Sequence, residues 1–216
     1  MVERIYWKKQ LPAISQRWRL LCLAGPRQIG KTTFLKDQGI YFSFDDPKLR
    51  RDVSQDPVSW LMKEFKKGKR VILDEATRLP EIFEAMKVLS DRFPNDKGRL
   101  WFASSSNYRL HSRIRESLAG RAVIYHGSPF LLSELSQNEN PPFFRWLLER
   151  ESCEGIFADE KKIISSALHR SLFPEPYLSN DDIYAGEWLK QYIATYVLQD
   201  VVDAYPRTDF VKWQDF

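Results

Sequence analysis

The stretch that determines the fold is Gly25-Pro26-Arg27-Gln28-Ile29-Gly30-Lys31-Thr32. Glycine at its first position and Gly-Lys-Thr at its last three, between an apolar run and an expected helix, are typical of a phosphate-binding loop. Gly25 and Gly30 would let the backbone come closer to a phosphate than a Cβ atom allows. The N–H groups from Ile29 to Thr33, at the start of the helix, would direct their dipoles at the anion. The motif therefore predicts that residues 25–33 bind a nucleoside triphosphate.

Four side chains predict what happens to that nucleotide. Lys31 would reach the β- and γ-phosphates, and the Thr32 hydroxyl would ligate Mg²⁺. The apolar run at 71–73 predicts a strand that ends at Asp74, whose carboxylate is suited to hold the Mg²⁺ hydration shell. Glu75 follows directly and is the expected general base for an attacking water. Together they favour ATP hydrolysis with Mg²⁺ over a kinase, in which the acceptor is not water.

Residues after the next two strands extend the candidate site. Ser104 and Ser105 follow the apolar run at 100–103 and are candidate sensors of the γ-phosphate or the attacking water, with Ser105 favoured. The alternative is that this polar run is only a turn and a helix cap. Arg121 is the favoured arginine finger or sensor, because Gly120-Arg121 precedes a strand at a fixed turn. It would act in cis or across the interface of a homo-oligomer. The other candidate arginines are Arg109, Arg113 and Arg115.

Strands and helices alternate along the first part of the chain. Strands are expected at 19–24, 40–44, 71–73, 100–103 and 122–125, with helices between them. This alternation predicts a mostly parallel sheet with both faces covered. After about Pro129 only helical stretches are expected, near 143–150, 160–172 and 182–204. We therefore predict an α/β core at 1–128 and a helical appendage at 129–216.

Composition narrows the function classes. The chain has 33 Lys and Arg against 29 Asp and Glu, a net charge of +4 that permits nucleic-acid contact but gives it only weak support. Cys22 and Cys153 form no CxxC or Cys/His cluster, so neither a disulfide framework nor a zinc site is indicated. The chain opens without the apolar region of a signal peptide, and no run reaches the length of a membrane span. We expect a cytoplasmic protein without a membrane partner.

Further motifs follow the loop in a fixed order. They are Asp45-Asp46-Pro47, Asp74-Glu75 with Leu79-Pro80-Glu81 and Phe83, Glu116-Ser117-Leu118-Ala119-Gly120-Arg121, Ser128-Pro129 and Leu132-Ser133-Glu134-Leu135. With Gly25–Gln28 and Gly30–Thr33, this set resembles one family of prokaryotic AAA+-type ATPases over about residues 20–136. The segment from Tyr192 to Asp200 is similar to a later family segment. Two positions depart from the family pattern: Ser104-Ser105-Ser106 replaces Gly-Ser-Ser after Ala103, where Thr is usual, and Thr77 stands where Gln is usual.

The resemblance implies a P-loop NTPase fold. Its parallel sheet would have the order 5-1-4-3-2 between helices, with the nucleotide at the carboxyl ends of the strands. Members usually continue into a C-terminal domain that resembles a nuclease fold, so this chain is expected to be a truncated member.

Three functions remain open at this stage. The first is an ATPase that uses hydrolysis to drive a conformational change. The second is a nucleotide-controlled binding module with little intrinsic hydrolysis, and the third is a DNA-acting ATPase. ATP is expected rather than GTP, because the guanine-reading pattern Asn-Lys-x-Asp does not occur in the sequence.

Overall fold

Five parallel strands form the sheet at the centre of the computed structural model, which describes residues 2–105, 114–136 and 157–197. The strands are β1 (Leu20–Ala24), β2 (Ile40–Ser43), β3 (Val71–Asp74), β4 (Leu100–Ser104) and β5 (Ala122–His126). They lie in the order β2-β3-β4-β1-β5, and every pair is parallel. This confirms the predicted α/β P-loop NTPase fold with strand order 5-1-4-3-2.

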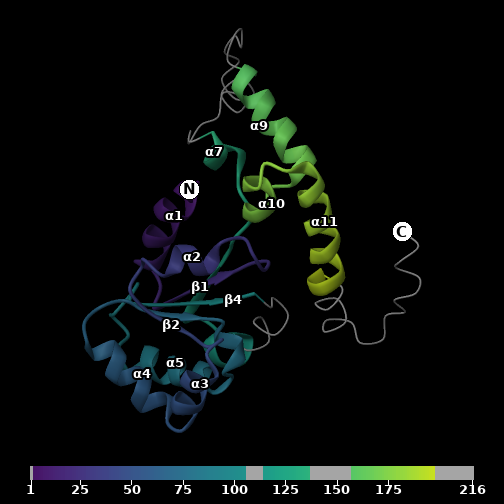
Figure 1. Cartoon of the computed structure of the whole chain (residues 1–216). Helices are drawn as coiled ribbons and strands as arrows, with labels where there is room; N and C mark the ends of the chain where they lie inside the picture. The colour runs from purple at the N-terminus through teal and green to yellow at the C-terminus, as the bar shows by residue number, and fades with distance from the viewer. Residues whose placement is uncertain (1, 106–113, 137–156, 198–216) are drawn as a thin grey trace.

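Helices cover both faces of the sheet, as Figure 1 shows. On one face lie α1 (Ile5–Ser15) and α2 (Lys31–Leu35), and on the other lie α3 (Pro47–Ser54), α4 (Pro57–Lys66) and α5 (Glu81–Arg92). Two shorter helical turns are η1 (Ala76–Arg78, 3₁₀) and η2 (Ile114–Leu118, π).

Alternation along β1 explains why the apolar core has two parts, one on each face of the sheet. Because successive side chains of a strand point to opposite faces, Leu21 and Leu23 pack with α1 and α2. Leu20, Cys22 and Ala24 pack on the side of α4 and α5. All five residues of β1 are buried, as expected for a parallel strand covered on both faces.

Local signals set the helix starts on the α4 side. The Asp56 side chain accepts a hydrogen bond from Ser59 N (2.9 Å) and Pro57 occupies the first turn of α4, a common helix start. The sequence did not lead us to expect α3, which begins after Asp46 in the same way. Its inner face consists of only two apolar residues, Leu49 and Val53, and so short a pattern is easily missed in a sequence.

The second part of the chain is helical where the structure describes it. It contains α7 (Leu132–Leu135), α9 (Phe157–Arg170), α10 (Pro174–Leu178), α11 (Asp182–Tyr192) and the π-helical turn η3 (Ile193–Val197). Figure 1 shows α10 on the side of the sheet where α1 and α2 lie. The helix expected at 143–150 and the end of the stretch at 182–204 lie outside the described residues. The division at 128/129 stays a prediction. Among the described helices, none has the length and apolar character needed to span a bilayer.

A buried ion pair joins the start of the chain to this second part. Arg4 is 7% exposed, and its Nε donates to Oε1 of the fully buried Glu134 (3.1 Å) in α7. Its other nitrogens donate to the carbonyls of Ile29 (2.8 Å) and Ser128 (2.7 Å). The guanidinium also lies 3.7 Å from the centre of the Trp7 ring, a cation–π contact. Arg4 thus connects the amino terminus, the loop at 25–32 and the segment after β5.

We expect that Arg4→Met lowers the free energy of unfolding by about 3–5 kcal/mol, because it leaves the Glu134 carboxylate buried without its cation. Urea unfolding would measure the change. Lys8→Met is the control: it removes the exposed Lys8–Glu3 pair and should cost less than about 1 kcal/mol. Equal losses in the two variants would contradict the assigned role of Arg4.

Candidate functional site

The candidate site lies where three neighbouring strands end. The strands β3, β4 and β1 are adjacent and parallel, so their carboxyl ends meet at one edge of the sheet. The loop at 25–32 follows β1, Asp74 ends β3 with Glu75 next to it, and Ser105 follows β4. This edge is where open α/β sheets bind their ligands.

The loop backbone requires glycine at two positions. Gly25 has φ +154°, and a Cβ atom there would lie 2.6 Å from the Gly127 carbonyl oxygen. Gly30 has φ +91° and precedes the first turn of α2, with open space where a Cβ would stand. Gln28 also has a positive φ, +62°. The backbone thus turns sharply and leaves the amino end of α2 open to an anion.

Lys31 points back into the loop. Its Nζ donates to the carbonyl oxygens of Gly25 (2.7 Å) and Pro26 (2.6 Å), and the residue is 5% exposed. Burial lowers the pKa of Lys31 to about 8, although the nearby carboxylates of Glu75 and Asp74 act in the opposite direction. An ammonium group has three N–H donors, so one remains for a phosphate oxygen.

The buried Asp74 carboxylate collects donors from three elements. Its Oδ2 accepts hydrogen bonds from Thr32 Oγ1 (2.6 Å) and from the Tyr41 hydroxyl (2.7 Å). Its Oδ1 accepts one from Glu75 N (3.0 Å). The two residues predicted to hold Mg²⁺, Thr32 and Asp74, are therefore in direct contact.

Sequence reasoning missed Tyr41, although a signal for it existed. The hydroxyl of Tyr41 binds Asp74 from β2, and burial together with this hydrogen bond raises its pKa. In the register of β2 and β3, Ser43 is paired with Asp74, and Tyr41 lies two residues earlier on the same face of the strand. The predicted strand order already placed β2 beside β3, so this register was the missing step.

Glu75 is held by the end of β4. Its φ is +51°, which is rare for a residue other than glycine, and its Oε2 accepts a hydrogen bond from Ser105 Oγ (3.1 Å). Its Oε1 accepts none from the described residues. Ser104 Oγ instead lies 2.9 Å from Thr77 Oγ1. The two positions at which this chain differs from the family pattern, Thr77 and Ser104, are therefore in contact. Ser105 contacts Glu75, and its role as a sensor stays a prediction.

A cavity of about 490 Å³ opens over these residues. Its lining includes Arg27, Gln28, Gly30, Lys31, Thr32, Thr33 and Glu75 from the core, and Pro174, Glu175 and Tyr196 from the helical part. A second cavity of about 740 Å³ shares Gly30, Thr33 and Pro174 with it, and contains Ile29, Phe34 and Phe130.

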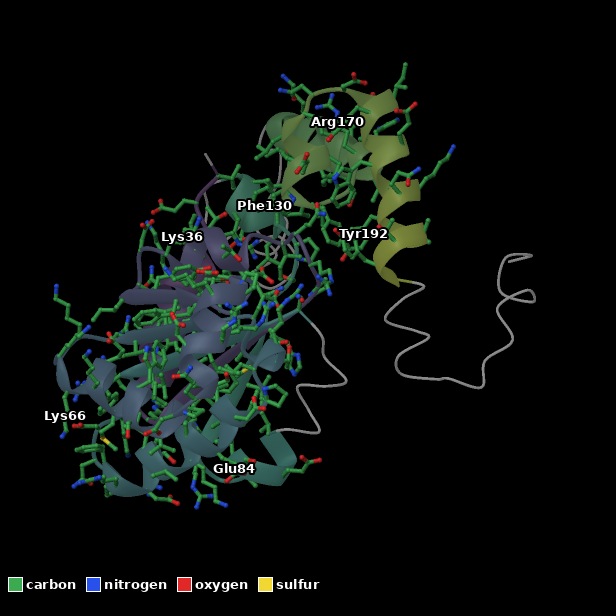
Figure 2. The ribbon with its side chains drawn as sticks, turned by 60° about the horizontal axis from the view of Figure 1, so that its bottom comes forward. Lys36, Lys66, Glu84, Phe130, Arg170 and Tyr192 are labelled. Carbon is green, nitrogen blue, oxygen red and sulfur yellow. The ribbon has the colours of Figure 1, made fainter. Side chains whose placement is uncertain are left out.

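The helical part contacts the loop directly. The Tyr192 hydroxyl donates to the Arg27 carbonyl (3.3 Å), and the Arg27 guanidinium lies 5.2 Å from the Tyr196 ring centre. Figure 2 labels Tyr192 in α11, beside the core. The resemblance marked the segment from Tyr192, but the spacing of these tyrosines fits an ordinary amphipathic helix and does not predict a contact with the loop.

Arg121 lies at the amino ends of the strands, opposite the carboxyl ends where the phosphate loop lies. It precedes β5, whose five residues span about 16 Å, and its guanidinium makes two hydrogen bonds to the Asp91 carboxylate (2.7 and 2.9 Å). The loop follows Ala24, which is paired with the far end of β5 at His126. The predicted action of Arg121 in cis is therefore wrong, because the side chain cannot span the strand. Action across a subunit interface stays a prediction.

The other candidate arginines have no described side chain. Arg109 and Arg113 and the side chain of Arg115 lie outside the described part of the chain.

The oxygen donors present suit a hard cation. Among the described residues there is no group of three or more His, Cys, Asp or Glu that could enclose a metal ion. Mg²⁺ is commonly held by one or two protein oxygens together with water and substrate phosphates. The Thr32 hydroxyl and the Asp74 carboxylate fit that kind of site.

Comparison with known proteins identifies a family. A model of the AAA domain matches residues 17–136, more than half of the chain. Among solved structures, the chain is similar to the RuvB Holliday junction branch migration motor of Thermotoga maritima, with 21% identity and a TM-score of 0.38. That match covers 63% of this chain and 49% of the RuvB chain, so it spans about half of the latter. A search of the curated proteins found no match. The chain belongs to the AAA domain family, a family of ATP-binding P-loop ATPases.

Proposed function

We propose that this protein binds ATP with Mg²⁺ and hydrolyses it to drive a conformational change. The observation that carries the proposal is the convergence of Lys31, Thr32, Asp74 and Glu75 at the carboxyl edge of the sheet. The phosphates would lie against the loop backbone and the amino end of α2, with the Lys31 ammonium offsetting their charge.

Thr32 and Asp74 would hold the metal. Mg²⁺ would supply neutralisation of the negative charge on the β- and γ-phosphate oxygens. Tyr41 would keep Asp74 oriented, because its hydroxyl already donates to Oδ2 of that carboxylate. Three protein groups would thus define the position of the ion.

Glu75 would act as the general base. Ser105 holds its Oε2, which leaves Oε1 to accept a proton from the attacking water. The water oxygen would form a bond to the γ-phosphorus as the bond to the β-γ bridging oxygen breaks, giving ADP and inorganic phosphate. In this role Ser105 is a positioning residue, because it acts through Glu75.

The nucleoside would occupy the second cavity. That cavity adjoins the first through Gly30 and Thr33, and the rings of Phe34 and Phe130 among its lining suit a flat, apolar base. Burial of the base there would place the nucleotide between the core and α10.

A second candidate function is a nucleotide-controlled binding module with little hydrolysis. It is favoured by the contacts of Tyr192 and Tyr196 with Arg27, since these link the phosphate loop to α11 and η3. Nucleotide binding could then move the helical part without turnover. Single-turnover phosphate release separates the two functions: measurable release supports the ATPase, and its absence in an ATP-saturated chain supports the binding module.

Variants of the two central residues should separate binding from turnover. We expect Lys31→Ala to abolish ATP binding, because it removes the cation in the loop, and Glu75→Gln to bind ATP normally but lose at least about 100-fold in turnover. Isothermal titration and phosphate release would measure these effects. Glu81→Gln, an exposed glutamate at the start of α5, is the matched control. Unchanged turnover in Glu75→Gln would exclude Glu75 as the base.

The Tyr41 hydroxyl should affect the metal rather than the nucleotide. We expect Tyr41→Phe to raise the Mg²⁺ concentration needed for half-maximal turnover by about tenfold, because Asp74 loses a hydrogen bond that orients it. ATP binding without Mg²⁺ should stay unchanged. Tyr177→Phe, whose ring packs on Phe130, serves as the control. If both variants need the same Mg²⁺ concentration as the parent protein, Tyr41 has no part in placing the metal ligand.

A further inference from the structure

Two hollows are lined by no residue of the phosphate loop: the first lies along α4 and the end of α5, and the second lies at the amino ends of β1, β4 and β5. The first, of about 460 Å³, is lined by Val58, Ser59, Met62, Lys63, Lys66 and Arg92. The second, of about 370 Å³, includes Arg17, Trp18, Arg19, Lys97 and Arg121 in its lining. Arg92, at the end of α5, lines the first hollow, and Pro94, two residues later, lines the second, so the end of α5 connects the two.

This surface is basic although the chain as a whole is nearly balanced. Three of the six residues that line the first hollow are Lys or Arg, as are four of the eight that line the second, and neither lining includes an acid. Asp91, just outside, pairs with both Arg19 and Arg121 and so offsets only one of two positive charges. The remaining five cations, which we call the basic edge, have no acidic partner among the described residues: Arg17, Lys63, Lys66, Arg92 and Lys97.

An exposed aromatic ring stands within this surface. Trp18 is 37% exposed and lies between Arg17 and Arg19 in the chain. Its backbone is fixed, because the Trp18 carbonyl accepts a hydrogen bond from Gly98 N (3.1 Å) next to Lys97. A tryptophan held among cations offers a face on which a base can stack.

The surface is separate from the nucleotide site. Figure 2 shows Lys66 at the far side of the core from Tyr192, which contacts the phosphate loop. The second hollow lies at the opposite end of β1 from the loop, since Arg19 precedes this strand and the loop follows it. A ligand could therefore occupy the basic edge while ATP occupies the loop.

We infer that the basic edge and Trp18 form a binding surface for single-stranded nucleic acid. The five unpaired cations would contact phosphates along a strand, and Trp18 would stack on a base. An acidic protein would satisfy the cations but gives no reason for an exposed indole between two arginines. A regular duplex keeps its bases stacked inside, so it could not use the indole face in this way. The single strand accounts for both features.

Fluorescence anisotropy tests this surface with a labelled oligothymidylate of about 20 nucleotides, titrated with the whole chain at several KCl concentrations. We expect a slope of log K against log salt of about −3.5, because five cations contribute about 0.7 each on a single strand. K63Q/K66Q/R92Q should reduce the magnitude of that slope by about 2. Trp18→Ala should weaken binding by about tenfold at every salt concentration without changing the slope.

Two controls locate the bound strand. K36Q/K48Q/K190Q removes three exposed lysines elsewhere, with the same change in net charge, and should leave the slope nearly unchanged. Lys31→Ala disables the phosphate loop and should leave oligothymidylate binding intact. Loss of binding in Lys31→Ala would show that the strand occupies the loop and would overturn the inference.

Other results would also overturn it. One is no binding in about 0.05 M salt, where such contacts are strong. Another is an equal drop in slope for the two triple variants, which would mean that only net charge matters. The third is that Trp18→Ala keeps the affinity of the parent protein, and that polyglutamate or duplex DNA displaces the labelled strand as well as unlabelled oligothymidylate does. That result would assign the surface to an acidic protein or to a duplex.

Discussion

The rest of the candidate site depends on the buried carboxylate of Asp74. A charge that is 1% exposed is costly unless donors surround it, and here they come from Thr32 on α2, Tyr41 on β2 and the backbone of Glu75. These elements can meet only if β2 lies beside β3 and the loop after β1 extends past β4 toward Asp74. The strand order and the path of the loop thus bring three donors to one carboxylate, and the proposed metal ligands meet there.

The features that the sequence predicted correctly, apart from the strand order, follow from local patterns of residues. The phosphate loop has required glycines, and the structure shows why at Gly25, where a side chain would collide with Gly127. Asp56 and Pro57 mark the start of α4 through their own chemistry. The strand order came from the resemblance to a family rather than from any local pattern, and the structure confirms it.

What could not be predicted depends on residues that are distant in the chain. Arg4 and Glu134 are 130 positions apart, and no local pattern around either residue predicts that the two form a buried ion pair. Tyr192 and Tyr196 contact Arg27 only because the helical part folds back onto the loop. For Arg121 the sequence predicted a contact that the fold does not allow in cis. The turn before β5 was recognised, but a turn does not show at which end of the strands the side chain lies.

The position of β1 has a consequence for how the chain is made. Of the five strands, β1 leaves the ribosome first, yet its neighbours begin about 80 and 102 residues later, because Leu20 pairs with Leu100 of β4 and with Ala122 of β5. At typical synthesis rates, an apolar strand that ends up wholly buried would wait roughly 4 to 16 seconds for its first neighbour. By contrast, β2 and β3 pair across only about 31 residues. The nascent protein is therefore most exposed to aggregation, and most in need of a chaperone, in the interval between its phosphate loop and its fourth strand.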